Sequence, residues 1–351
     1  MNAKWHESGT TGAAGGHLAY SGVMQTPEAE LPEAEIDGRP ATLTANDGRA
    51  LAARWFEPVG PAHAVAVVSA AGGVPQGYYR AFAQWLAARG YAVLTYDYRG
   101  IGASRQGPLR DDPSRMADWA LLDMSAALAA AAARAGKGGP LPLLMVGHSF
   151  GGNCAAFAHG VQRADAILMV ASGTGEPRLY PWPQRALLSF FFRLWLPALL
   201  PLFGHLPGWA LGPGAQPLPA GAARQWVRWG LRRGWAFADP EMAAHSAAAT
   251  LSAPLHLWSI DDDRSYAPRR AVDALAAHFT HAAVQRHHLL PADAALRQLG
   301  HFGVFRRQAG APLWLRLMQP LEAAVPALQP PAHQGKAART AAAGAGYSAP
   351  P

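Results

Sequence analysis

Short apolar runs alternate with amphipathic helical patterns over most of the chain. Strands are predicted at residues 64–69, 92–96, 143–146, 166–170, 255–260 and 284–289. Between them, apolar residues recur three or four positions apart and predict helices at 78–89, 116–134 and 267–279, with others beginning near Gly151 and Gly303. Strands that alternate with helices form a mostly parallel sheet with helices on both faces, so we expect an α/β fold.

The two ends of this pattern differ from its middle. Residues 41–44 and 51–56 flank Asn-Asp-Gly at 46–48, a hairpin signal that predicts an antiparallel pair at the start of the sheet. Residues 1–40 and 329–351 have no sustained period and are predicted as disordered tails. The α/β core is therefore expected at 41–172 and 250–320.

Residues 173–249 interrupt the alternation and are predicted to form a helical cap inserted into the core. Half of the 12 tryptophans lie in this segment, which is too apolar for a linker. Its most apolar stretch, 186–203, approaches the length of the shortest membrane span, but Arg193, Pro197 and Pro201 interrupt it. We therefore expect a broken pair of apolar helices and no integral membrane span.

Composition narrows the range of functions. The single cysteine excludes a disulfide framework within the chain, a Cys-only zinc site and an iron–sulfur cluster. The net charge of +7 comes from dispersed arginines without the basic blocks that bind nucleic acid, so no nucleic-acid partner is expected. The first thirty residues lack a secretory signal pattern, which makes the cytoplasm the expected location. Composition does not indicate an oligomeric state.

One motif carries clear chemistry. Gly147-His148-Ser149-Phe150-Gly151 stands between a predicted strand and a predicted helix, the context of a nucleophile elbow. A side chain two residues to either side of the serine would clash as the chain turns sharply. The turn exposes the Ser149 hydroxyl and directs the Phe150 N–H toward a forming oxyanion. The alternative is an ordinary glycine-rich turn, but strand, motif and helix in register favour the nucleophile.

A serine hydroxyl needs a general base, and His301 is the best candidate among the 14 histidines. It lies in the glycine-flanked sequence Leu-Gly-His-Phe-Gly at 299–303, after the last predicted strand. His148, His287 and His288 are interpreted as structural.

The acid that orients the base should follow the strand at 255–260, where Asp261-Asp262-Asp263 stands. Three adjacent carboxylates are too many for one role. We favour Asp263, with Asp262 as the alternative.

With these residues the chain resembles the α/β-hydrolase superfamily over about residues 41–320. The elbow, the loop Asp-Tyr-Arg-Gly-Ile-Gly-Ala-Ser at 97–104, the segment 71–79 and the closing Gly-His-Phe-Gly-x-Phe-Arg are similar to a bacterial subgroup of predicted hydrolases with a tryptophan-rich cap and unassigned substrates. The resemblance implies the α/β-hydrolase fold and an architectural role for loop 97–104. Many members carry His-Gly after the third strand, where this chain has Ala70-Ala71, so Gly72 would supply the second oxyanion N–H.

The expected function is that of a serine hydrolase that cleaves a small, largely apolar ester, or a thioester or amide, through an acyl-enzyme. Phe190 and Trp195 of the cap are the candidate substrate-binding residues. Cys154 is interpreted as a buried hydrophobe, and no cofactor or metal site is expected, since no nucleotide or metal-ligand motif is present. Acyl transfer or perhydrolysis by the same triad remains an alternative, as does a catalytically silent fold that binds a ligand.

Overall fold

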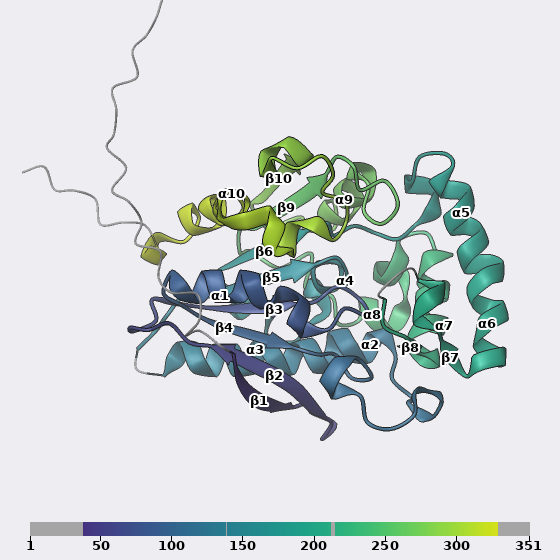
Figure 1. Ribbon diagram of the computed structural model, residues 1–351, viewed down its shortest axis with the longest axis horizontal. Helices are drawn as coiled ribbons and strands as arrows, with labels where there is room; N and C mark the ends of the chain where they lie inside the picture. Colours follow the sequence, from purple (N-terminus) through teal and green to yellow (C-terminus); the bar gives the residue numbers. More distant parts are fainter. Residues whose placement is uncertain (1–37, 138, 212–214, 329–351) are drawn as a thin grey trace, which may run out of the picture. The chain divides into compact units, whose positions relative to one another are not determined.

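An eight-stranded sheet forms the centre of the protein (Figure 1). The computed structural model describes residues 38–137, 139–211 and 215–328. The strand order is β1-β2-β4-β3-β5-β6-β9-β10. Strands β1 and β2 are antiparallel to their neighbours, whereas β3, β4, β5, β6, β9 and β10 run parallel to one another. The strands are β1 (Arg39–Thr44), β2 (Ala50–Phe56), β3 (Ala64–Ser69), β4 (Tyr91–Tyr96), β5 (Leu143–His148), β6 (Ala166–Val170), β9 (Leu255–Ile260) and β10 (Val284–Leu289).

The burial of the strands explains why their sequences are so apolar. Every residue of β3, β4, β5, β6 and β9 is buried, because helices cover both faces of the parallel part of the sheet. The edge strand β10 is partly exposed and carries polar side chains. The predicted α/β-hydrolase fold, with its antiparallel start and mostly parallel sheet, is confirmed.

Helices pack on the two faces of the sheet. α1 (Arg80–Ala88) follows a short 3-10 turn at Gln76–Tyr79 and meets α10 (Gly310–Ala323), where the rings of Phe82 and Trp314 lie 5.7 Å apart. On the other face lies a continuous helical stretch that comprises α2 (Met116–Asp118), a π segment (Trp119–Asp123) and α3 (Met124–Gly136) (Figure 1). α9 (Arg269–Ala276) packs on β9.

One predicted helix boundary was wrong, and one helix that begins where it was predicted is short. The helix after the elbow, α4, has only four residues, Phe150–Asn153, because its Gly-Gly-Asn sequence has low helical propensity and the chain continues as a 3-10 turn. The last helix begins at Gly310, not near Gly303, because Arg306 is extended and separates two short 3-10 turns. Residues 1–37 and 329–351 of the two predicted tails lie outside the described part of the chain.

The insertion between β6 and β9 is mostly helical. It contains α5 (Gln184–Phe190), a π segment (Phe191–Trp195), α6 (Leu196–Phe203), the short pair β7 (His205–Leu206) and β8 (Leu218–Pro219), α7 (Ala220–Gly230) and α8 (Pro240–Ala243). α7 packs on α2 of the core and also on α6. α7 therefore forms an inner layer of the insertion, and α5 and α6 form an outer layer at the edge of the view in Figure 1.

The expected broken pair of helices was wrong. α5, the π segment and α6 form one continuous helical stretch, Gln184–Phe203. Pro197, which has no N–H to donate, comes shortly after the π segment. The wider turn of that segment allows the helix to continue without this hydrogen bond. Among the described residues, two helical stretches are long and apolar enough to cross a membrane by length and composition alone: Met116–Gly136, whose most apolar 18-residue window is 61% buried, and Gln184–Phe203, whose window is only 22% buried.

Candidate active site

Ser149 lies at a sharp turn between β5 and α4. Its backbone has φ 50° and ψ −115°, a strained conformation for a residue with a side chain. Hydrogen bonds hold the turn: the Ser149 N–H donates to the Val170 carbonyl at 2.9 Å, and the Ser149 carbonyl accepts from the Gly152 and Asn153 N–H groups. The Ser149 side chain is only half-buried, which leaves the hydroxyl within reach of a substrate.

The glycines of the elbow are required by close approach. A Cβ on Gly147 would lie 2.5 Å from the Gly152 nitrogen, and a Cβ on Gly151 would lie 2.1 Å from the Ser69 carbonyl oxygen. Both contacts are far shorter than van der Waals separation and involve backbone atoms that cannot rotate away. The clash argued from the sequence is confirmed.

Two backbone donors stand side by side next to the elbow. A Cβ built on Gly72 would lie 3.5 Å from the Cβ of Phe150, the first residue of α4. The neighbouring Ala71 N–H donates to the Tyr79 hydroxyl at 2.8 Å. Within the described residues, neither the Gly72 nor the Phe150 N–H donates to another protein group. This pair of free donors has the composition of an oxyanion hole.

His301 and Asp263 form a buried pair. The His301 Nδ1 lies 2.6 Å from the Asp263 Oδ2, and the two residues are only 5% and 3% exposed. The carboxylate also accepts hydrogen bonds from the Tyr266 and Ala267 N–H groups at 3.1 Å each. A carboxylate can only accept, so the hydrogen-bond pattern assigns the proton to Nδ1 and leaves Nε2 as the free acceptor.

The other two aspartates of the triplet have different partners. Asp262 accepts from the Leu299 N–H at 2.9 Å and from the Gly300 N–H at 2.8 Å, which fixes the backbone just before His301. Asp261 faces His288 at 3.3 Å. Of the three aspartates, Asp263 is the one whose side chain contacts His301 among the described hydrogen bonds.

His148 ties the elbow to the loop that bears His301. Its Nδ1 lies 2.7 Å from the Tyr79 hydroxyl, and its Nε2 lies 3.0 Å from the His301 carbonyl oxygen. The His301 carbonyl oxygen can only accept, so the His148 Nε2–H donates to it; the neutral ring then accepts at Nδ1 from the Tyr79 hydroxyl, which itself accepts from the Ala71 N–H. Burial, with the charge of His301 as a second cause, holds the pKa of His148 well below its usual value, so the ring stays neutral. The structural interpretation of His148 fits these contacts.

Two further tyrosines, which sequence reasoning missed, hold the His301 loop. The Tyr78 hydroxyl donates to the Phe302 carbonyl, and the ring of Tyr266 stacks on His301 with centroids 4.6 Å apart. The His301 ring also lies 5.1 Å from that of His148, beside the elbow. Among the described residues the Ser149 hydroxyl has no hydrogen-bond partner; catalytic hydrogen bonds commonly tighten only when substrate binds.

Phe190 and Trp195, the expected substrate-binding residues, lie on the outer helical stretch of the insertion. Phe190 is 52% exposed, and the Trp195 ring contacts that of Trp209 at 6.2 Å. The described ring contacts do not join either residue to Ser149 or His301. Trp226 of α7 faces this helical stretch from within and contacts Phe191 and Phe192.

Loop 97–104 ties several strands together. Asp97 accepts hydrogen bonds from Gln76 and Ala103, and the Ser104 hydroxyl accepts from the Ala52 N–H. Arg99 bonds Asp123 at 2.7 Å and Asp47 at 2.6 Å, and its guanidinium lowers the pKa of Asp47. These contacts join the first hairpin, β4 and the helical stretch 116–136, which supports the architectural role that the resemblance implies.

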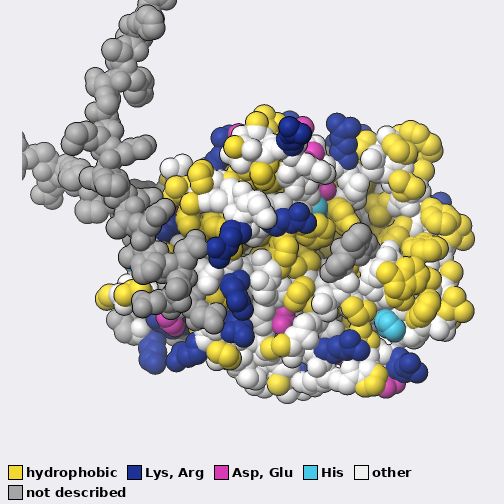
Figure 2. Space-filling view, viewed as in Figure 1, with side chains coloured by type: hydrophobic (Ala, Val, Ile, Leu, Met, Phe, Trp, Pro, Cys, Tyr) yellow, Lys and Arg dark blue, Asp and Glu magenta, His cyan; other side chains and the backbone are white. Residues whose placement is uncertain are grey.

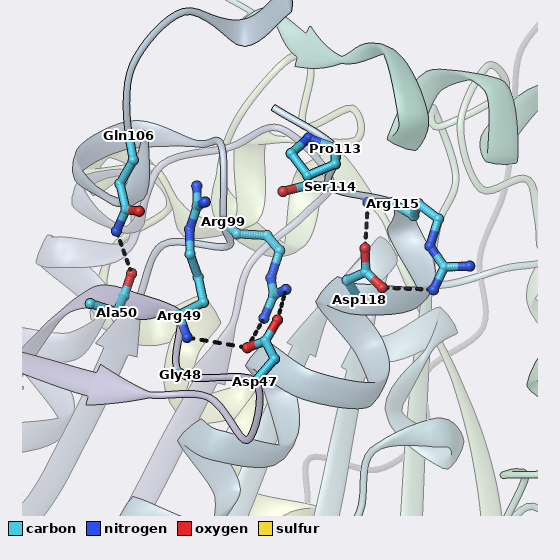
Figure 3. Close-up of a pocket in the computed structure, with 10 residues that line it drawn as sticks. All are labelled: Asp47, Gly48, Arg49, Ala50, Arg99, Gln106, Pro113, Ser114, Arg115 and Asp118. Atoms are coloured by element: carbon cyan, nitrogen blue, oxygen red, sulfur yellow. Dashed lines mark hydrogen bonds and ion pairs between the residues drawn. The ribbon is translucent and has the colours of Figure 1, made fainter. Parts of the chain in front are cut away.

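A cavity of about 610 Å³ opens beside this network (Figure 3). Asp47, Arg49, Arg99, Arg115 and Asp118 line it, together with smaller side chains. Figure 3 shows Asp47 held by Arg99 and by the Arg49 backbone, and Asp118 held by Arg115. None of the candidate triad residues lines this cavity; Asp47 pairs with Arg99, Asp118 pairs with Arg115, and the Arg49 side chain pairs with Asp112 at 3.0 Å.

Cys154 is completely buried, and burial raises the pKa of its thiol well above the usual value. It is therefore a protonated, inert core residue. Among the residues that the structure describes, no three His, Cys, Asp or Glu side chains are grouped to hold a metal ion.

Comparison with known proteins places the chain in a family. Residues 60–288 match the family described as serine aminopeptidase, S33. The chain belongs to the serine aminopeptidase S33 family. It is an α/β serine hydrolase, and the S33 match covers the elbow and Asp263. No curated protein matches the chain.

Solved structures agree on the fold of this S33 member. One is brefeldin A esterase, a bacterial homologue of human hormone sensitive lipase, with 17% identity over 88% of this chain and 81% of that chain and a TM-score of 0.52. Another is a putative hydrolase from Agrobacterium vitis S4, with 16% identity over 83% of this chain and 99% of that one and a TM-score of 0.50. At such identities the likeness shows the fold alone.

Proposed function

We propose that the protein cleaves a small, largely apolar carboxylic ester through a Ser149-His301-Asp263 triad and an acyl-enzyme. The observation that carries the proposal is the buried His301–Asp263 hydrogen bond of 2.6 Å in a loop that packs against the nucleophile elbow. A buried carboxylate on the Nδ1 of a histidine stabilises the imidazolium that forms when the other ring nitrogen takes a proton.

The reaction follows from the positions of these groups. The Ser149 Oγ attacks the acyl carbon while the His301 Nε2 accepts its proton, and the free N–H groups of Gly72 and Phe150 stabilise the oxyanion. His301 then gives the proton to the leaving alcohol. Water, deprotonated by His301, attacks the acyl-enzyme and releases the acid and Ser149. The charge of Asp263 stabilises the imidazolium in both halves.

An ester fits the charges of this site better than a peptide with a free amino terminus. An aminopeptidase binds a terminal ammonium, which is favoured by a carboxylate that is available to pair with it. Asp262 and Asp263 are engaged by backbone N–H groups and His301, and buried Glu176, in the loop after β6, pairs with Arg178 at 2.8 Å. The family name nevertheless makes amide cleavage the second reaction to assay.

A fluorophosphonate probe tests the nucleophile directly. Wild-type protein should be labelled covalently, and Ser149→Ala should abolish labelling while the matched change Ser265→Ala, in the exposed loop after Asp263, should leave it intact. Labelling that persists in Ser149→Ala would overturn the assignment of the nucleophile. A folded wild type that is not labelled at all would instead favour a silent, ligand-binding fold.

The bond cleaved is tested by comparing p-nitrophenyl butyrate with aminoacyl p-nitroanilides at equal enzyme concentration. The proposal requires a higher kcat/KM for the ester. A preference for the anilides would assign an aminopeptidase and leave the triad in place. Transfer of the butyryl group from the acyl-enzyme to an added alcohol, in preference to water, would assign an acyltransferase.

A further inference from the structure

The outer helical stretch Gln184–Phe203 exposes an unusual amount of apolar surface. Leu187, Phe190 and Leu194 are spaced three and four residues apart, so they share one side of the helix, and they are 64%, 52% and 60% exposed. Leu202 near the end of the stretch is 75% exposed. Figure 2 shows hydrophobic side chains gathered over the region of α5 and α6. We call this set, with Trp182, Trp195, Phe203 and Trp209, the apolar face.

The opposite side of the same stretch is already used by the fold. Phe192 and Leu196 are buried, and Phe192 contacts Trp226 of α7 with ring centroids 5.7 Å apart. The helix therefore has large apolar residues on both its packed side and its exposed side. A soluble surface rarely leaves so large an apolar area uncovered, which indicates a docking surface.

The charge around the apolar face points to the occupant. Residues 177–238 contain seven arginines and no Asp or Glu, and two of these arginines, Arg178 and Arg228, pair with Glu176 and Asp239 just outside the segment. Arg185 and Arg193 lie on the helical stretch itself, are exposed and have no ion pair within the described residues. An apolar helix that carries exposed, unpaired cations is typical of a segment that lies in the interface of an anionic membrane.

The aromatic residues support the same occupant. Trp182 and Trp209 are 79% and 61% exposed, and the rings of Trp195 and Phe203 contact Trp209 near the end of the helix. Tryptophan is enriched where hydrocarbon meets lipid headgroups, because its ring is apolar and its N–H needs a polar partner.

Two other arrangements fit less well. A symmetric dimer through the apolar face would bring the unpaired Arg185 and Arg193 toward a second cationic segment of the same kind. A helix that spans the membrane would have to leave α7 and carry Arg193 into the hydrocarbon. A lipid surface needs neither change, and it does not demand a groove of matching shape.

We propose that the apolar face docks this protein on anionic lipid bilayers, with Leu187, Phe190, Leu194 and Leu202 in the hydrocarbon boundary and the arginines at the headgroups. The helical stretch lies along the surface, because its other side remains packed on α7. The proposal does not depend on which bond the triad cleaves.

Vesicle sedimentation tests the proposal. Full-length protein is mixed with vesicles of phosphatidylcholine and phosphatidylglycerol, or of phosphatidylcholine alone, and the bound fraction is measured against lipid concentration. Binding should be stronger to the anionic vesicles and should weaken as salt is raised. The double variant Leu187→Glu/Leu194→Glu should lose at least about a hundredfold in affinity, since each change removes an apolar side chain that the bilayer buries in the bound state.

Matched variants separate the apolar face from general effects. Val59→Glu/Leu290→Glu makes the same chemical change at exposed apolar residues outside the cap and should bind like wild type. Arg185→Gln/Arg193→Gln should weaken binding to anionic vesicles by up to about 25-fold, at about fivefold per arginine, whereas Arg163→Gln should not. Unchanged circular dichroism of each variant shows that it is folded.

Three results would overturn the proposal. One is no binding of the wild type to anionic vesicles, and another is equal binding of wild type and Leu187→Glu/Leu194→Glu. The third is self-association without vesicle binding, seen by sedimentation velocity and abolished by the same double variant, which would assign the apolar face to a second copy of this chain. None of these results depends on catalytic activity, so they are distinct from a failure of the proposed esterase function.

Discussion

Replacing Asp263 and Asp262 by Asn, one at a time, should produce opposite patterns of damage. Each change removes one negative charge and keeps the shape of the side chain. Asp263 contacts His301, whereas Asp262 contacts only the backbone of Leu299 and Gly300. The first variant should therefore lose activity, and the second should mainly lose stability.

The structure sets the size of the Asp263→Asn effect. An amide has one oxygen, and the Asp263 Oδ2 accepts two hydrogen bonds, from His301 and Ala267, whereas Oδ1 accepts one, from Tyr266. The amide therefore keeps its oxygen toward His301 and preserves the tautomer, but loses the charge. One charge about 4 Å from the imidazolium, at an effective dielectric constant of about 20, is worth about 4 kcal/mol, or about a thousandfold in kcat.

Asp262→Asn has a different cost. Whichever way the amide turns, its NH₂ group faces the N–H of either Leu299 or Gly300, and one part-buried hydrogen bond is lost. We expect a loss of about 1–3 kcal/mol in the free energy of unfolding and a smaller fall in kcat, below about a hundredfold, as the loop loosens.

Urea denaturation and kcat for a p-nitrophenyl ester measure the two effects on the same preparations. Asp261→Asn is the matched control: its side chain is 56% exposed and meets only His288 at 3.3 Å, so both quantities should stay near wild type. A larger fall in kcat for Asp262→Asn than for Asp263→Asn would refute the assignment of the acid.

Four further outcomes are expected. Ser149→Ala and His301→Ala should each lower kcat/KM for an activated ester by at least about a thousandfold without altering the circular dichroism, and activity of Ser149→Ala within about tenfold of wild type would contradict the mechanism. Tyr79→Phe should lower the urea midpoint by the equivalent of about 1–3 kcal/mol and reduce kcat, because the Ala71 N–H loses its acceptor and His148 its donor. The specificity constant should rise from acetyl to medium-chain esters by up to about fourfold per methylene, and a flat profile would show that the site does not bury the acyl chain. Burial lowers the pKa of His256 to about 4, below the ordinary 6.5, so the stability that its neutral form contributes is present above pH 6.5 and is lost as pH falls toward 4. Other histidines with lowered pKa values add to the fall, so the expected result is that the loss in a titrated urea series is smaller in His256→Phe than in wild type by about 2–3 kcal/mol.

Steric and periodic features of the fold could be predicted from the sequence because they are local. Strands β3, β5, β6 and β9 are buried on both faces, and such strands read as unbroken apolar runs. The elbow glycines are required by atoms only a few residues away or on the adjoining strand. Both features restrict which residue types can stand at these positions, so they can be recognised in the sequence.

The hydrogen bonds of the candidate site could not be predicted in the same way. Asp261, Asp262 and Asp263 are identical in type, and one residue of register in the loop after β9 decides which of them reaches His301. Tyr79 meets the elbow because the loop after β3 folds across it. No hydrophobic period along the sequence indicates such contacts. The adjacent tyrosines at 78 and 79, next to the predicted oxyanion loop, were the one indication that the sequence offered.

In the cap, a local rule led to a wrong prediction: proline does remove a helical hydrogen bond, but the helix does not break. Pro197 and Pro201 each remove a helical hydrogen bond, yet Gln184–Phe203 continues as one helix, because the π segment before Pro197 accommodates the gap and α7 packs along one side. The sequence also does not distinguish the packed side from the exposed side when both sides of a helix carry large apolar residues. Phe192 and Phe190 are alike in the sequence, but one is 1% and the other 52% exposed. The position of α7 therefore decides that Phe192 stabilises the cap and leaves Phe190 on the face that we assign to the lipid surface.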